Sequence, residues 1–329
     1  MPIFNFIYRK REWNEKEQAF LGWERKRGML TQLNDYLIGK IKNPFRVNTL
    51  ENTKLEKIKY IITLDSDTDL VLNTAFELVG AMAHILNKPK IDKERNIVVD
   101  GYGIMQPRIG VNLDISYKTL FTKIFAGSGG TDFYTNAISD LYQDNFSEGI
   151  FTGKGIYDLD VYSQVLEKQI PENTVLSHDL LEGCYLRCGL VSDIMLMDGY
   201  PCNYSSFMNR LSRWIRGDWQ ILRWLKPKSP LNLLSKYKIF DNLRRSLIEV
   251  SIIIAIIYSC VVGIVKVKPV FLSIGIMLGI IIFPYLLEML NNFIFKKEGE
   301  QKQKTFTPKI EGLRGAIYRA IIILRKFAI

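Results

Sequence analysis

The sequence has little of the chemistry from which zinc and redox centres are built. Its 329 residues include 2 histidines and 4 cysteines, and no two cysteines stand in a Cys-x-x-Cys spacing. A structural zinc site needs four such ligands close together, so we predict none here. We expect the cysteines to be reduced and mostly buried, with Cys260 in lipid or in the protein interior.

Acidic residues are scarce in one stretch of the chain. The formal net charge is +10, and between Ser205 and Arg245 ten basic residues are opposed only by Asp218 and Asp241. No helix-turn-helix, zinc-finger or RNP-like pattern accompanies this basic stripe, so we predict no nucleic-acid partner. Anionic lipid headgroups or the diphosphate of a nucleotide explain its position better.

Two long apolar stretches follow the basic stripe. Residues 246–265 carry one charge, Glu249, and residues 269–290 carry one, Glu288. Each approaches the ~20 residues that a membrane-spanning helix needs. Basic residues on both outer flanks predict a transmembrane hairpin with both ends in the cytoplasm. No signal peptide opens the chain, so we expect the residues before the hairpin to be cytoplasmic too.

Residues 1–235 alternate short β-branched or aromatic runs with helical patterns. The predicted strands are 3–8, 59–64, 97–99 and 103–106, and the predicted helices are 15–37, 73–86 and 180–186. The dipeptide Asp100-Gly101 indicates a hairpin between the last two of these strands. The pattern predicts an α/β domain over 1–235, with a parallel or mixed sheet covered by helices.

Residues 236–329 are predicted to form an interfacial and transmembrane region. A polar linker at 299–308 follows the two apolar stretches, and residues 313–329 have an amphipathic pattern. This last segment is expected to lie on the membrane or to begin a third span. Because the pattern runs to the final residue without a helix cap, we expect the chain to be part of a longer one.

A hydrophobic strand runs directly into two carboxylates, Asp65 and Asp67. In open α/β sheets, ligands collect at the carboxyl ends of strands. Two carboxylates separated by one residue can bind one hard cation, which in turn bridges a diphosphate. The alternative is an ordinary acidic loop, with Asp69 as a helix cap, and the motif alone leaves both open.

The tripeptide Ser177-His178-Asp179 precedes a helical run. A carboxylate at a helix start is an ordinary N-terminal cap. The same carboxylate can serve as a general base that takes the proton from an acceptor hydroxyl. The two roles are compatible.

Residues 210–220 contain three arginines and two tryptophans. Arginines can hold phosphate oxygens through paired hydrogen bonds, and tryptophans can stack on sugar rings or lie at a membrane interface. An interfacial helix without any substrate contact is the alternative. The glycine-rich segments 127–130 and 151–158 do not match a P-loop; they are either flexible loops or places where the backbone approaches a ligand.

Taken in order, these segments resemble the processive family 2-like glycosyltransferases, such as cellulose and hyaluronan synthases, which have the GT-A fold. In that family the first aspartate pair holds a metal–UDP complex, the later aspartate is the base, and a Gln-x-x-Arg-Trp motif lies near the diphosphate and the acceptor. Here Arg210 stands in the place of the glutamine, and His178-Asp179 in that of the usual acidic pair. Longer blocks resemble a narrower group, the cyclic β-1,2-glucan synthases of glycosyltransferase family 84. These blocks are 22–28, 62–68, 139–144, 151–158, 177–183 and 213–220.

This resemblance covers roughly residues 5–329 and implies an inverting transfer of glucose from UDP-glucose, in β-1,2 linkage, with Mg²⁺ or Mn²⁺. It also implies a bacterial inner (plasma) membrane protein whose catalytic domain is cytoplasmic. Asp179 is the implied catalytic base, and Asp65 and Asp67 are the implied metal ligands. The implied contacts of the UDP-sugar donor are Lys26, Gly28, Asp65, Asp67, Arg210, Arg213, Trp214 and Arg216, with Asn34 as a weaker candidate. The implied contacts of the growing glucan acceptor are Gly153, Lys154, Tyr157, His178 and Trp219.

The family's domain begins with an earlier strand and its proteins continue far downstream. We therefore expect a fragment that lacks N- and C-terminal domains and whose sheet has an exposed edge. Two alternatives remain open: a synthase of another linkage, such as a β-1,3- or β-1,4-glucan, or a truncated membrane fragment without catalysis.

Overall fold

The computed structural model describes residues 4–51, 57–116, 118–126 and 140–263, together with four single residues at 275, 276, 279 and 283. The chain divides into two compact units. Unit 1 comprises residues 1–110, 132–198 and 212–239, and unit 2 comprises 111–131, 199–211 and 240–329. Unit 2 thus takes two segments, 111–131 and 199–211, from within the domain that the sequence predicts at 1–235.

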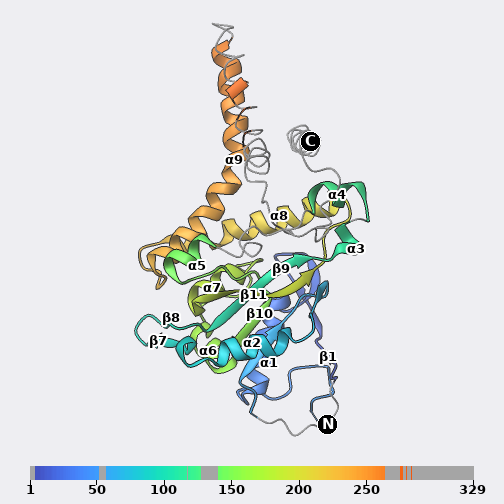
Figure 1. Cartoon of the computed structure of the whole chain (residues 1–329), viewed down its shortest axis with the longest axis vertical. Helices are drawn as coiled ribbons and strands as arrows, with labels where there is room; N and C mark the ends of the chain where they lie inside the picture. Colours follow the sequence, from blue (N-terminus) through green and yellow to red (C-terminus); the bar gives the residue numbers. More distant parts are fainter. Residues whose placement is uncertain are drawn as a thin grey trace, which may run out of the picture. The chain divides into compact units, whose positions relative to one another are not determined.

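A five-stranded sheet forms the centre of unit 1, in the order β5–β10–β9–β11–β6 (Figure 1). Its strands are β5 (Tyr60–Thr63), β6 (Thr68–Asp69), β9 (Ile104–Val111), β10 (Gly155–Asp158) and β11 (Cys188–Asp198). β10 runs antiparallel to both β5 and β9, and β11 runs antiparallel to β6. The sheet is therefore not purely parallel. Among the described strands, β5 has β10 as its one neighbour and is an edge strand.

The other strands form two-stranded ladders. These pair β1 (Ile7–Tyr8) with β4 (Val47–Asn48), β2 (Arg11–Asn14) with β3 (Ala19–Gly22), and β7 (Lys90–Asp92) with β8 (Ile97–Asp100). The helices of unit 1 are α1 (Arg25–Leu37), α2 (Thr74–Ala83), α5 (Leu141–Phe146), α6 (Leu159–Leu166) and α7 (Asp179–Leu186). Unit 2 contains α3 (Leu113–Ser116) and α4 (Leu120–Phe125), and the division between the units falls within α8 (Tyr204–Gln220) and α9 (Leu233–Gly263). Short 3₁₀ turns lie at Ile85–Asn87 and Ile221–Leu225.

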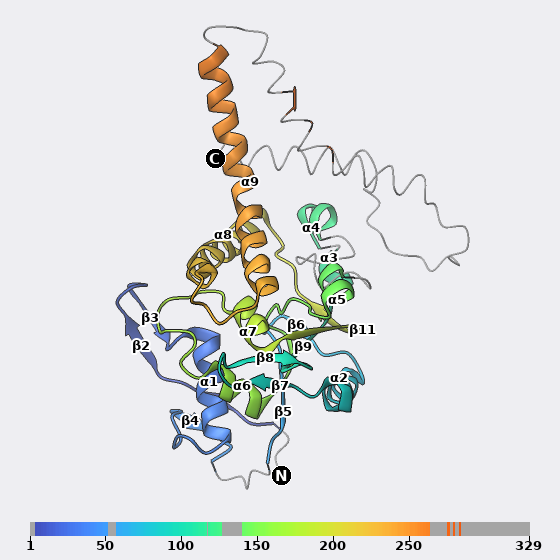
Figure 2. The ribbon, with the colours of Figure 1, turned by 90° about the vertical axis from the view of Figure 1, so that its left-hand side faces the viewer.

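Helices pack on both faces of the central sheet. Successive residues of a strand point to opposite faces, so neighbouring residues of β10 contact different helices. Ile156 of β10 packs with Leu78 and Met82, which lie one turn apart on α2. The next residue, Tyr157, packs against Tyr162 of α6 with the ring centroids 4.3 Å apart and the rings tilted by 30°. Helix α1 lies beside α6 (Figure 2). Burying side chains of this size contributes ~1.5–3 kcal/mol each. The predicted α/β sheet covered by helices is confirmed.

The predicted helix over 15–37 is correct only from Arg25 onward, because residues 11–22 form the β2–β3 hairpin. The side-chain oxygen of Asn14 accepts hydrogen bonds from the backbone N–H groups of Lys16 and Glu17, at 3.0 and 3.1 Å, and closes the turn. Glu24 and Arg25 then have positive φ values of 49° and 52°. These local interactions prevent a helix from forming between residues 15 and 24, so the helix begins at Arg25.

The predicted hairpin at Asp100-Gly101 is also wrong. β8 pairs with β7, and β9 pairs with β10 in the central sheet. Gly101 has φ +63°, and a Cβ atom there would overlap the carbonyl group of Lys88. The dipeptide therefore makes a tight turn, but one that carries the chain from one sheet to another.

Unit 2 has a small aromatic cluster of its own. Phe121 of α4 lies 6.3 Å from Tyr200 and 5.7 Å from Phe207 of α8, between ring centroids. The hydroxyl of Thr119 caps α4 and donates to the carbonyl of Cys202 at 2.7 Å. Among the residues that the sequence analysis selects for a site, only one lies in unit 2, namely Arg210.

Residues 246–263 of the first predicted membrane span belong to α9. In the part of the chain that the structure describes, no helix is both long and apolar enough to cross a membrane. The prediction of a span at 246–265 is therefore not confirmed. Within the second predicted span, at 269–290, the structure describes only the four single residues named above. The segments 127–130, 299–308 and 313–329 lie wholly outside the described residues.

Candidate active site

Asp65 lies two residues after the end of β5 and is held by two lysines. Its Oδ1 lies 2.5 Å from Nζ of Lys26 on α1, and its Oδ2 lies 3.4 Å from Nζ of Lys154, which precedes β10. Burial alone would raise the pKa of the Asp65 carboxyl, but the two ammonium groups outweigh it and lower that pKa. Asp65 is therefore an ionised carboxylate in a strongly cationic setting.

Lys154 also pairs with a second carboxylate, that of Asp198 at the end of β11. Asp198 is buried and accepts a further hydrogen bond from the hydroxyl of Thr68, at 2.8 Å. Burial would lower the pKa of Lys154, yet the hydrogen bond and charge of Asp198, and the charges of Asp65 and Asp67, raise it. Lys154 thus stays protonated between the ends of two strands of the sheet.

The loop at Gly153 joins this group of charges to Asp179. Its carbonyl oxygen accepts a hydrogen bond from Nζ of Lys26 at 2.7 Å and one from the hydroxyl of Thr63 at 3.3 Å. Gly153 has φ +92°, and a Cβ atom there would lie 2.8 Å from Oδ1 of Asp179. A side chain at this position would therefore be strained and would clash with the carboxylate. The glycine brings the backbone between Asp65 and Asp179.

Asp179 is the first residue of α7, and its side chain is 29% exposed. Nδ1 of the buried His178 lies 3.5 Å from Oδ1 of Asp179 and 2.9 Å from Oε1 of Glu182. The second approach is not aligned as a hydrogen bond, so it is an ionic contact. The same Oε1 accepts a hydrogen bond of 2.5 Å from the hydroxyl of Tyr162 on α6. Four polar side chains thus form a row from the surface into the core.

The charges in this row shift one another's pKa values. Burial would lower the pKa of His178, but the carboxylates of Glu182 and Asp179 raise it to about 9. Burial raises the pKa of Asp179; the charge of His178 opposes this, and that of Glu182 adds to it. His178 is therefore expected to be cationic at neutral pH, and Asp179 to be a weaker acid than an ordinary aspartate.

The second half of α8 lies against the segment that leads to Asp179. A Cβ atom on the buried Gly217 would lie 2.6 Å from Cβ of Ser177, and Oε1 of Gln220 accepts a hydrogen bond from the backbone N–H of Leu176 at 2.7 Å. Arg213 and Trp214 precede Gly217 by four and three residues, so they lie on the same side of the helix. They are thereby directed to the side of α8 on which Ser177 lies.

The remaining predicted residues fall into two groups. Arg213, Arg216 and Trp219 are exposed on α8. Gly28 and Tyr157 are buried: a Cβ atom on Gly28 would overlap Trp23, and the Tyr157 hydroxyl donates to Asn34 of α1 at 2.8 Å. The structure thus places Gly28, Asn34 and Tyr157 in the packing that holds α1 to the sheet. His178 is likewise buried, behind Asp179.

Two sets of oxygen and nitrogen ligands could hold a cation. Among the described residues, His178, Asp179 and Glu182 are the set of three whose ligand atoms all lie within 4.8 Å of one another. The pKa of His178 is raised to about 9 in this set, so at neutral pH a cation would have to displace a proton from the ring. Asp65 and Asp67 offer only carboxylate oxygens, which suit a hard cation such as Mg²⁺ or Mn²⁺. As two protein ligands they leave room for the oxygens of a diphosphate.

Sequence reasoning missed Asp198 and Tyr162 and did not assign a role to Glu182. Glu182 follows His178 by four residues on a helical run, a spacing that places the two side chains together and could have found this contact. Asp198 and Tyr162 carry no local signal, because their partners Lys154 and Glu182 lie 44 and 20 residues away in the sequence.

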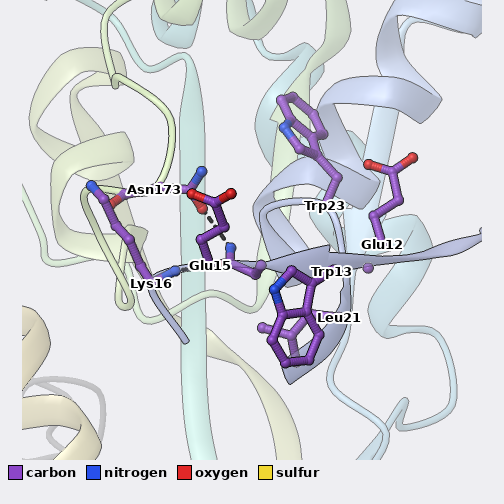
Figure 3. A pocket seen from close by; sticks show the side chains of 9 residues that line it. Glu12, Trp13, Glu15, Lys16, Leu21, Trp23 and Asn173 are labelled. Atoms are coloured by element: carbon purple, nitrogen blue, oxygen red, sulfur yellow. Dashed lines mark hydrogen bonds between the residues drawn. The ribbon is translucent and has the colours of Figure 1, made fainter. Parts of the chain in front are cut away.

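A separate pocket, of about 360 Å³, opens on the β2–β3 hairpin (Figure 3). Its lining includes Trp13, Trp23 and Asn173, and Nζ of Lys16 donates to the carbonyl of Asn173 at 3.0 Å. None of the residues predicted to bind the donor, the acceptor or a metal lines this pocket. The pocket and the group of charges around Asp65 and Asp179 are therefore different features.

No protein-family model matches the chain. A stretch of 250 residues, 75% of the chain, is 44% identical to part of the cyclic beta-(1,2)-glucan synthase NdvB of Rhizobium meliloti (strain 1021). The chain spans 9% of the length of that relative. The resemblance that the motifs predict is confirmed: over three quarters of its length, the chain is related to one segment of a cyclic β-1,2-glucan synthase.

Proposed function

We propose that the chain is the glycosyltransferase segment of a glucan synthase, which transfers glucose from UDP-glucose to a hydroxyl of a growing glucan, in β-1,2 linkage and with inversion. One observation carries the proposal. A single glycine loop, at Gly153, lies between a carboxylate paired with lysines and a carboxylate paired with a histidine. The first environment suits a diphosphate and a cation, and the second suits a proton.

On the donor side, Asp65 and Asp67 would hold Mg²⁺ or Mn²⁺. The ion supplies a Lewis acid that neutralises the departing diphosphate. Lys26 and Lys154 now contact both oxygens of Asp65, and they can pair with phosphate oxygens instead when a donor is bound. Asp198 keeps Lys154 in place and charged. Each ammonium that turns to the diphosphate stabilises the negative charge developing on it.

On the acceptor side, Asp179 would take the proton of the attacking hydroxyl. The bond between the acceptor oxygen and the anomeric carbon forms as the bond from that carbon to the diphosphate breaks, so UDP leaves and the configuration inverts. The raised pKa of Asp179 brings this base closer to the working pH, where general bases are most effective. Arg213 and Trp214 lie on the side of α8 that packs near this carboxylate and can contact the donor or the acceptor.

The proposed location is the bacterial inner membrane, with the transferase on the cytoplasmic side. Its support is the sequence alone: two apolar stretches flanked by basic residues. The proposed partners are likewise the UDP-sugar donor, the glucan acceptor, the lipid bilayer and the further domains of a full-length synthase.

The test is transfer of radiolabelled glucose from UDP-glucose, with Mg²⁺, by membranes that express this chain. We expect metal-dependent polymer from the wild type and none above background from Asp179→Asn. Asp193→Asn, which removes an exposed carboxylate of β11, is the matched control and should keep its activity. No transfer by a folded wild-type chain would favour the alternative of a fragment without catalysis, and linkage analysis of any product would decide between β-1,2 and other glucans.

A further inference from the structure

The row of polar side chains behind Asp179 is a poor source of stability. Glu182 is 1% exposed and His178 is 7% exposed, so both have lost most of their hydration. The desolvation of a buried ion pair commonly cancels its attraction, and apolar residues of the same size would serve the fold as well or better. Since the pair next to Asp179 adds little to stability, we look for a role that it has in the function of Asp179.

The surroundings of Asp179 indicate that reason. Asp179 is faced by His178 and Glu182 of its own segment, by Lys26 of α1 and by Asp65 after β5. His178 is faced in addition by Arg27 of α1, and Glu182 by Tyr162 of α6. The backbone of Gly217 on α8 packs against the neighbouring Ser177.

Among the described residues, His178 and Lys26 are the cations that act most strongly on Asp179, and they are not equivalent. Nζ of Lys26 lies 2.5 Å from Oδ1 of Asp65, on the side where the proposed function places the diphosphate. When a donor is bound, Lys26 has an anion of higher charge to contact. His178 has no such competing partner, because it is buried and its ring faces Glu182. His178 is therefore the cation that stays beside Asp179 throughout the reaction.

We propose that Glu182 and Tyr162 are positioning residues that act on the base Asp179 through His178. Glu182 holds the imidazole in its protonated form, with Nδ1 at 2.9 Å from Oε1 of Glu182 and at 3.5 Å from Oδ1 of Asp179. Tyr162 in turn holds Glu182 by its hydrogen bond. The protonated ring keeps Asp179 ionised and correctly oriented until it takes the acceptor proton. The inference rests on the proposed function, which makes Asp179 the base.

The first test needs no transfer activity. The chain has 2 histidines, so isotope labelling of histidine in the full chain gives two sets of NMR signals, and the exposed His84 is an internal control. We expect His178 to titrate near pH 9 in the wild type. Glu182→Gln should lower the pKa of His178 by at least about one unit and leave His84 unchanged, since it removes the charge that favours the imidazolium. An unchanged His178 in this variant would overturn the proposal.

The second test reads the effect on the base. In the transfer assay, Glu182→Gln and Tyr162→Phe should lower kcat by ~10- to 100-fold, a common cost of a misplaced catalytic group. The KM for UDP-glucose should stay unchanged, and the acidic limb of the pH–kcat profile should move. Glu167→Gln, which neutralises an exposed glutamate, is the matched control.

Glu182→Ala separates positioning from packing. Glutamine keeps the shape and the hydrogen bond from Tyr162, so a purely structural role predicts that Glu182→Gln behaves as the wild type and that only Glu182→Ala is impaired. That outcome would overturn the proposal. If the wild type transfers no glucose, the proposed function fails at its own test, while the histidine titration still decides whether Glu182 controls the charge of His178.

Discussion

Asp65 and Asp179 lie on either side of the same loop and yet have opposite environments. Asp65 contacts two lysine ammonium groups, which lower the pKa of its carboxyl. Asp179 sits at the start of α7 beside a histidine and near a second buried carboxylate, and its pKa is raised. The surroundings thus favour the ionised form of Asp65 and disfavour that of Asp179.

This difference arises from packing and not from residue type. Lys26 comes from α1 and Lys154 from the start of β10, so the cationic side is assembled by the sheet and the helix beside it. His178 and Glu182 come from the segment of Asp179 itself, so the second side is largely local. In many active sites, two groups of the same type have pKa values that their surroundings shift in opposite directions, and the two groups then have different catalytic roles.

Neutralising each aspartate in turn gives the largest expected effect. Asp179→Asn removes the proposed base and should lower kcat by ~10²- to 10⁴-fold, the usual contribution of such a group. Asp65→Asn should lower transfer by a similar factor for another reason, because it removes a proposed metal ligand. Rates measured against Mn²⁺ concentration separate the two variants: the metal requirement should rise in Asp65→Asn and stay as in the wild type in Asp179→Asn.

The comparison would fail if the two variants had the same metal requirement. In that case both aspartates would belong to one cation site, and the assignment of Asp179 as the base would be wrong. Asp193→Asn again serves as the control for a change of surface charge.

The next largest effect concerns the two lysines of Asp65. The side chains of Lys154 and Asp198 are 12% and 4% exposed, whereas those of Lys26 and Asp65 are 33% and 37% exposed. Lys154→Met leaves a buried carboxylate without its cation and should cost ~3–5 kcal/mol of unfolding free energy. Lys26→Met breaks a more exposed pair and should cost at most ~1 kcal/mol. Urea unfolding of both variants checks this; equal costs would contradict the burial argument.

The shared loop offers a smaller but cleaner measurement. Gly153→Ala should destabilise the protein by roughly 2–3 kcal/mol, since the new Cβ meets the Asp179 carboxylate and the residue must keep φ +92°. Gly39→Ala is the matched control, because Gly39 has φ +77° and nothing within 4 Å of a new Cβ. The control should show the backbone strain alone, ~1 kcal/mol. Thermal unfolding of both variants gives the difference, and equal shifts would show that the loop does not press on Asp179.

The comparison also explains how far the sequence could predict this site. β5 and α7 were predicted close to their observed bounds, because each is a continuous run with one pattern. Asp65 and Asp179 could be selected because each stands at the end of such a run. Periodicity does not predict the hairpin at residues 11–22, because backbone hydrogen bonds accepted by the Asn14 side chain and positive φ values decide it.

The partners of the two aspartates were harder to predict than the aspartates themselves. Nothing near Lys154 in the sequence indicates that Asp198 holds it, and Tyr157 was assigned to an acceptor although it lies 1% exposed in the core. Both depend on how β10 is placed between β5 and β9. All four residues of β10 are buried, with Ile156 packed on α2 and Tyr157 on α6, and the sequence does not say which residue faces which helix layer.

The smallest expected effect is a change of stability with pH, and the two sides of the loop should respond at opposite ends of the range. His178 has a pKa of about 9, above the 6.5 of an unfolded histidine, so its ion pairs contribute fully below pH 6.5 and are lost as the pH rises through about 9. The pKa of Asp65 lies below its unfolded value of 3.8, so its ion pairs contribute above that pH and are lost as the pH falls.

Unfolding free energies of wild type, His178→Gln and Asp65→Asn, measured from pH 3 to pH 10, check this. The wild type should lose on the order of 1–2 kcal/mol between pH 7 and pH 9 through His178, and His178→Gln should lose less over that interval. Asp65→Asn should keep most of the alkaline loss and reduce the acidic one, because His178 contacts Asp179 and Glu182, whereas Asp65 contacts Lys26 and Lys154. If His178→Gln kept the full alkaline loss, His178 would not be cationic at neutral pH, and the contrast between the two aspartates would rest on Asp65 alone.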